Sequence, residues 1–149
     1  MKILNGISDF YHGQELLNYH SRKKNLTEGD QFLTLKPVNS TTVDTLFSKI
    51  SELLVQFPVS CIGVIEADRS VFQNNIQDYR DMFIPVSFFH CHMIVKNSPE
   101  IISLQRTWID LNEGLVQSFH RKEVNNLSGL ICYFTKQINE NPTVCIFEN

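Results

Sequence analysis

Apolar side chains recur every three or four residues along several segments of the chain, which is the spacing of one face of an α-helix. The clearest segment can begin at the hydroxyl of Thr41 and ends at Pro58, because the residue before a proline is disfavoured in the helical conformation. The pattern predicts helices over residues 9–20, 43–57, 70–83, 98–119 and 127–138. Within the last of these, residues 131–134 also fit a strand.

Shorter apolar runs predict strands over residues 31–38, 59–65, 86–95 and 143–147. Because helices separate these strands along the chain, we expect right-handed crossovers. The fold class is then α/β, a single globular domain over residues 1–149 with about four mostly parallel strands flanked by helices. The alternative is an α+β fold with a mixed or antiparallel sheet.

Composition narrows the class of protein. The chain has 149 residues, of which 42% are hydrophobic and 19% charged, so it can form one core and is too apolar for intrinsic disorder. Lys+Arg is 13 and Asp+Glu is 16, which gives a net charge of −3. The two basic clusters, residues 22–24 and 120–122, are short, and we interpret them as solvated helix ends. We therefore expect no nucleic-acid partner.

The expected compartment is the cytoplasm. Polar residues interrupt the apolar run at the N-terminus, so it is too short for a signal sequence. No stretch approaches the roughly 18 apolar residues of a membrane span, and we expect no membrane partner. Cys61, Cys91, Cys132 and Cys145 lie in apolar runs and form no Cys-x-x-Cys pair. This pattern is typical of reduced, buried thiols.

Loops that join predicted strands to predicted helices offer one candidate site. In a parallel sheet such loops meet at the carboxyl edge, where the N-termini of helices favour an anion. Asp68, Arg69, Ser70, Lys96 and Ser98 are therefore candidate ligand-binding residues. The alternative is that Ser70 and Ser98 only cap their helices. The loops lack the glycines of a phosphate-binding motif, and we expect no cofactor.

His90 and His92 offer a second candidate site. Alternation along a strand places both imidazoles on one face, close enough to share one metal ion. A catalytic zinc needs a third ligand, for which His120, Asp68 and Glu66 are candidates. The alternative is a pair of partly buried histidines that bond to neighbouring side chains or to water.

Two classes of function follow from these observations. The first is a small non-catalytic interaction protein, similar in profile to the immunity or antitoxin-type inhibitors of bacteria, which would bind a cognate toxin. For its partner surface, Asp78, Asp81, Tyr11 and Tyr19 are candidates. The second is a small-molecule binder or a metal-dependent hydrolase that uses the strand-end loops or the histidine pair. The first class is the preferred prediction, and no catalytic residues are assigned.

Overall fold

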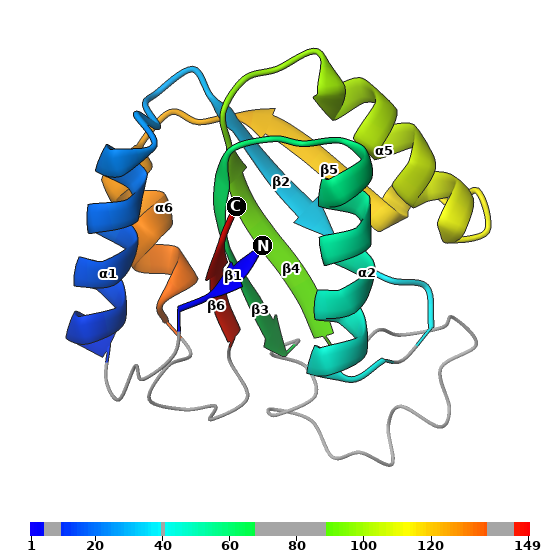
Figure 1. Ribbon diagram of the computed structural model, residues 1–149, viewed down its shortest axis with the longest axis horizontal. Coiled ribbons are helices and arrows are strands. Elements are labelled where there is room, and N and C mark those ends of the chain that lie inside the picture. The colour runs from blue at the N-terminus through cyan, green and yellow to red at the C-terminus, as the bar shows by residue number, and fades with distance from the viewer. Residues whose placement is uncertain (5–9, 40, 68–88, 137–144) are drawn as a thin grey trace.

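The structure, a computed structural model, describes residues 1–4, 10–39, 41–67, 89–136 and 145–149. In this part of the chain a six-stranded sheet forms the middle layer, and helices cover both of its faces (Figure 1). The predicted helix over residues 70–83 lies outside the described residues.

All neighbouring strands of the sheet run antiparallel. The strands are β1 (Lys2–Ile3), β2 (Gln31–Leu35), β3 (Cys61–Ala67), β4 (Phe89–Val95), β5 (Phe119–Glu123) and β6 (Cys145–Glu148). Their order across the sheet is β1-β6-β3-β4-β2-β5. The prediction of about four mostly parallel strands is therefore wrong, and the arrangement is the α+β type with an antiparallel sheet.

The error has a topological cause. β2 and β3 do run in the same direction, as their helical connection implies, but β4 lies between them and runs the opposite way. β4 and β5 likewise share a direction, with β2 between them. Helical crossovers thus join strands of equal direction that are not neighbours. Periodicity along the chain does not reveal which strands become neighbours.

The helices form two outer layers. α1 (Phe10–Lys23) and α6 (Leu127–Phe134) cover one face, and α2 (Val43–Gln56) and α5 (Glu100–Leu111) cover the other (Figure 1). Each pair buries a separate apolar cluster against the sheet. None of the described helices has both the length and the hydrophobicity that crossing a membrane requires.

α2 shows how the local sequence defines a helix. Its N-cap is Thr42, one residue beyond the expected Thr41, and the Thr42 hydroxyl accepts a hydrogen bond from the Thr45 N–H at 3.1 Å. Leu46 and Ile50, one turn apart, are fully buried against the sheet. The helix ends just before Pro58, as predicted.

The segment after α5 differs from the prediction of a helix through Phe119. Glu113 and Gly114 have positive φ angles of 61° and 72°, which end the helical path and reverse the chain. A short 3-10 turn, Val116–Ser118, then leads into β5. The basic cluster of residues 120–122 therefore lies on an edge strand and not at a helix end. The helix predicted at residue 127 is confirmed as α6, and the strand alternative for residues 131–134 is excluded.

The four cysteines are unpaired. Cys61 and Cys91 are buried, as predicted, and burial raises the pKa of the Cys61 thiol to about 12. Cys145 is half-buried, and burial raises its thiol pKa to about 11. Cys132 is exposed, contrary to the prediction. The thiols of Cys61, Cys91 and Cys145 are therefore poor nucleophiles at neutral pH.

Gly63, in the middle of β3, permits a close approach of two neighbours. A Cβ atom at this position would lie 2.8 Å from Cε2 of Phe147 and 2.9 Å from the backbone oxygen of His92. We therefore expect Gly63→Ala to lower the free energy of unfolding by about 1–3 kcal/mol, because the backbone cannot yield without strain. Urea unfolding measures this. In a Gly63→Ala/Phe147→Val double variant the loss should be smaller than the sum of the two single losses. Additive losses would contradict this packing argument.

Candidate metal centre

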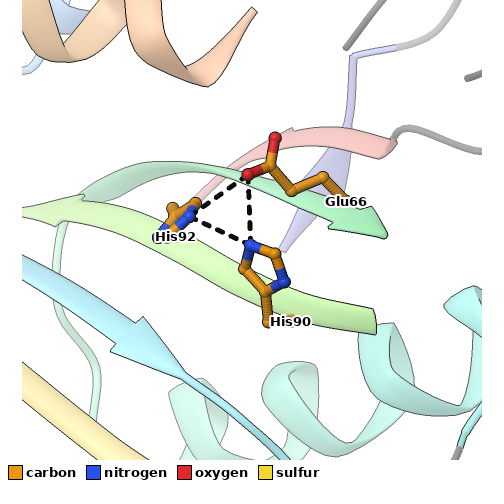
Figure 2. A group of neighbouring side chains, drawn as sticks. All are labelled: Glu66, His90 and His92. Atoms are coloured by element: carbon orange, nitrogen blue, oxygen red, sulfur yellow. Dashed lines mark hydrogen bonds and ion pairs between the residues drawn. The ribbon is translucent and has the colours of Figure 1, made fainter. Parts of the chain in front are cut away.

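β3 and β4 bring three potential metal ligands to one place. In their antiparallel register Glu66 lies opposite His90, and Val64 lies opposite His92. Because side chains alternate along a strand, these residues all point to the face that α1 and α6 cover. Glu66, His90 and His92 are 1%, 7% and 5% exposed, respectively. Figure 2 shows the three side chains converging from the two strands.

The ligand atoms form a small triangle. His90 Nε2 lies 3.0 Å from His92 Nε2 and 3.1 Å from Glu66 Oε1, and His92 Nε2 lies 3.2 Å from the same oxygen. An ion about 2.05 Å from each atom would sit about 1.0 Å above the plane of a triangle with these sides, with ligand–metal–ligand angles of about 98°. These angles lie between tetrahedral and octahedral values. The three residues therefore fit one face of either coordination shell, and the remaining coordination positions would fall to other ligands.

The ring of His92 is held on several sides. Its Nδ1 lies 2.9 Å from the hydroxyl of Thr34, on β2. The rings of Phe32 and Phe134 lie 5.4 Å and 5.9 Å from it, centroid to centroid. When Nδ1 donates its proton to Thr34, the lone pair of Nε2 points toward the triangle. Because the Thr34 hydroxyl can accept or donate, this contact fits the tautomer that binds a metal ion and equally the tautomer whose Nε2–H donates to Glu66.

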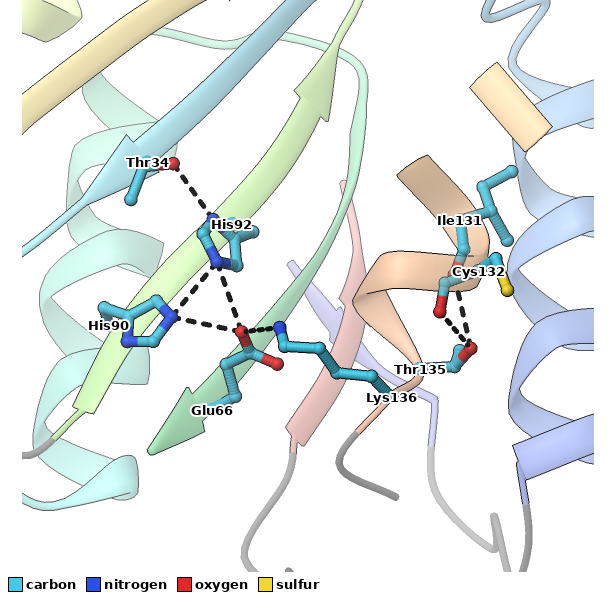
Figure 3. Close-up of polar contacts among 8 residues, drawn as sticks. All are labelled: Thr34, Glu66, His90, His92, Ile131, Cys132, Thr135 and Lys136. Atoms are coloured by element: carbon cyan, nitrogen blue, oxygen red, sulfur yellow. Dashed lines mark hydrogen bonds and ion pairs between the residues drawn. The ribbon is translucent and has the colours of Figure 1, made fainter. Parts of the chain in front are cut away.

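Charge at the site is balanced by a lysine. Nζ of Lys136, two residues after the end of α6, lies 2.6 Å from Glu66 Oε1 (Figure 3). Burial alone would raise the pKa of Glu66, but hydrogen bonds from His90, His92 and Lys136 outweigh it and hold that pKa well below its ordinary value. Glu66 is therefore ionised near neutral pH.

His92 favours the neutral form. Burial lowers the pKa of His92, and its hydrogen bond with Glu66 opposes this only in part. The neutral imidazole is the form that binds metal ions. A buried carboxylate beside a neutral imidazole is thus a donor set suited to a divalent cation.

Tyr133 lies against this cluster. Its ring is 5.4 Å from that of His92, centroid to centroid, and Nζ of Lys136 lies 3.6 Å from the Tyr133 ring centroid. Tyr133 is 45% exposed, so its side chain is accessible from solvent. The sequence analysis missed Thr34, Tyr133 and Lys136. The Tyr-x-x-Lys spacing of Tyr133 and Lys136, at the end of a predicted helix, was the available signal for the last two.

The sheet face continues beyond Thr34 onto β5. The β2–β5 register places His120 opposite Thr34 and Lys122 opposite Phe32. Nζ of Lys122 lies 5.5 Å from the Phe32 ring centroid. These four residues and Arg121 line a shallow pocket of about 310 Å³. A surface with aromatic and basic side chains therefore adjoins the histidine pair.

Of the third ligands considered from the sequence, the structure brings only Glu66 into contact with the histidine pair among the residues it describes. His120 is exposed on β5, separated from β4 by β2. Asp68 lies outside the described residues. The proximity of Glu66 to His90 depends on the antiparallel pairing of β3 and β4, which the sequence analysis did not predict.

The parallel sheet that would gather the candidate anion-binding residues at one edge is not formed among the described strands. Asp68, Arg69 and Ser70 follow β3 and lie outside the described residues. Lys96 and Ser98 follow β4, whose last residues pair with the first residues of β3 and therefore lie at the opposite end of the sheet. Lys96 Nζ donates to Asn25 O at 2.8 Å, and Ser98 Oγ accepts from the Glu100 N–H at 3.3 Å. The shared carboxyl edge expected for these loops depended on parallel strands, which this sheet lacks among the described residues.

Comparison of the chain with models of protein families, with curated proteins and with solved structures found no match.

Proposed function

We propose that the protein binds one divalent metal ion through Glu66, His90 and His92 and uses it to cleave phosphodiester bonds. The observation that carries the proposal is the triangle of ligand atoms, 3.0–3.2 Å on a side, beside Tyr133 and Lys136. Burying a carboxylate and two imidazoles in contact costs stability unless a cation or hydrogen bonds compensate. Such a donor set is typical of a functional site.

The neighbours of the triangle favour phosphoryl transfer. A divalent ion there would neutralise charge on a phosphate oxygen and orient the substrate. Tyr133 is the candidate nucleophile, since tyrosine can form covalent intermediates. Its Oη–P bond forms as the P–O bond to the leaving oxygen breaks. The tyrosine proton passes to solvent, and the leaving oxygen takes a proton from water. The product is a phosphotyrosine ester with one end of the cleaved chain.

Single-stranded nucleic acid is the substrate that this surface favours. The ligand atoms are almost fully buried, so a flexible strand can reach them more readily than a rigid duplex. Lys122 and His120 can contact the backbone phosphates, and Phe32 offers a ring beside them for a base. The expectation of no nucleic-acid partner depended on the net charge of the whole chain and on the shortness of the basic clusters, of which residues 120–122 are one. The proposal depends instead on where a few basic side chains lie.

The inhibitor hypothesis stays a prediction, because no observation among the described residues bears on a toxin partner. A two-histidine, one-carboxylate set also binds iron in oxygenases. The tyrosine and lysine against the triangle have no defined task in oxygen chemistry, and both have one in phosphoryl transfer. We therefore prefer the phosphodiester proposal.

Metal binding is the first test. Titration of the metal-free protein with Mn²⁺ or Zn²⁺ in a calorimeter should show one site per chain. His92→Ala should weaken binding by at least about a hundredfold, because even outer partners of a metal ligand contribute ten- to a hundredfold. His120→Ala is the matched control, since this exposed histidine lies on the same face outside the triangle. Equal affinity of the wild type and His92→Ala would contradict the proposed site.

A further inference from the structure

Lys136 follows α6 and extends its side chain toward Glu66, His90 and His92 on the face of the sheet that α6 covers. Thr135, which precedes it, closes the end of α6 by donating its hydroxyl to Cys132 O at 3.1 Å (Figure 3). The lysine side chain then extends across to Glu66, and only 16% of it is exposed. Its ammonium group is therefore held close to the buried carboxylate.

The ammonium and a metal ion would require the same atom. Lys136 Nζ lies 2.6 Å from Glu66 Oε1, and that oxygen is also one corner of the triangle formed with His90 and His92. A divalent ion bound there would lie within a few ångströms of a positive charge in a poorly hydrated place, where repulsion is strong. Simultaneous contact of the Lys136 ammonium and a divalent metal ion with Glu66 Oε1 is thus unfavourable.

The site offers the ammonium other positions. Glu66 Oε2 is buried and has no hydrogen-bond partner among the described residues. The face of the Tyr133 ring already lies 3.6 Å from Nζ. A phosphate bound to the metal ion would give the displaced ammonium a third and stronger partner.

We propose that Lys136 is a displaceable counter-ion, which competes with the metal ion for Glu66 Oε1 and moves to the substrate phosphate when the metal binds. The inference rests on the proposed function and deepens it. Lys136 keeps the buried carboxylate paired while the site is empty, so the metal binds weakly on its own. A phosphate that accepts the ammonium removes the competition. Metal and phosphate therefore bind cooperatively, and each raises the affinity of the other by the same factor.

The test compares Lys136→Met with the wild type in titrations with Mn²⁺. Lys136→Met should bind Mn²⁺ at least about tenfold more tightly, because one competing positive charge is gone. Lys136→Arg is the matched control that keeps the charge, and it should bind within about threefold of the wild type on the same reasoning. Repeating the titration with inorganic phosphate present should tighten Mn²⁺ binding to the wild type by a larger factor than binding to Lys136→Met, because only the wild type has an ammonium that the phosphate can accept.

Other outcomes separate the two proposals. If the wild type binds Mn²⁺ and Lys136→Met binds it equally or more weakly, competition by Lys136 is wrong and the metal site stands. If neither protein binds Mn²⁺, both proposals fail. Circular dichroism checks that Lys136→Met folds. If Lys136→Met does not fold, Lys136→Gln takes its place, because glutamine keeps a hydrogen-bond donor without the charge. Lys136→Gln should then bind Mn²⁺ more tightly than the wild type by the same factor.

Discussion

Replacing Tyr133 with phenylalanine should abolish phosphodiester cleavage while leaving metal binding intact. The change removes one hydroxyl and keeps the ring that contacts His92 and Lys136. Loss of a nucleophile should lower the rate by at least about a thousandfold, or about 4 kcal/mol of transition-state stabilisation. The measurement is cleavage of a fluorescent single-stranded oligonucleotide in the presence of Mn²⁺. Wild-type protein should also form a covalent adduct, visible as a shifted band on a denaturing gel.

The control for this experiment is Tyr19→Phe. Tyr19 is an exposed tyrosine on α1, 55% accessible, and its ring packs edge-on against His20, away from the metal centre. This variant should cleave and form the adduct as the wild type does. Cleavage by Tyr133→Phe at the wild-type rate would assign the attack to a metal-bound water molecule. It would remove the covalent step from the proposal.

Replacing Trp108 with alanine should cost about 3–5 kcal/mol in the free energy of unfolding. Trp108 lies on α5, is 1% exposed, and fills the core between the sheet and the α2/α5 layer. Its ring N–H also donates to the backbone oxygen of Ser118 at 2.9 Å, which fixes the turn before β5. The substitution removes both the buried ring and this hydrogen bond. Urea unfolding followed by far-ultraviolet circular dichroism measures the loss.

Two comparisons define what this result means. Leu111→Ala, on the same helix but exposed, should change stability by no more than about 0.5 kcal/mol. Mn²⁺ affinity of folded Trp108→Ala should match that of the wild type, because the tryptophan and the metal centre lie on opposite faces of the sheet. A loss below about 1 kcal/mol would show that the α2/α5 layer is not the main core.

Most helices and strands could be predicted from the sequence because their signals are local. The apolar spacing and the flanking Thr41 and Pro58 define α2 to within a residue or two. β5 was missed because its residues, Phe119–Glu123, are mostly exposed and charged. An edge strand with few buried side chains carries little periodic signal. The turn at Glu113 and Gly114 depends on backbone angles that composition alone indicates poorly.

Of the candidate site, too, one part could be predicted from the sequence and another part could not. That His90 and His92 lie on the same face of one strand could be predicted from the two-residue period of a strand alone. Glu66 entered the sequence analysis as one of three possible third ligands, and the pairing of β3 with β4 selected it. Lys136 is 70 residues away from Glu66 along the chain, and no local pattern connects them. Their contact follows from the placement of α6 over the sheet.

The sequence by itself determined most of the described helices and strands and the placement of His90 and His92 on one strand face, because each of these depends on residues close together in the chain. Only the tertiary structure decided strand order and direction, and with them the ligand set. β4 lies between β2 and β3 and runs against both, so Glu66 and Thr34 flank the histidines. Hydrogen bonding between distant strands decides such pairings, and neither helical periodicity nor a crossover rule specifies it.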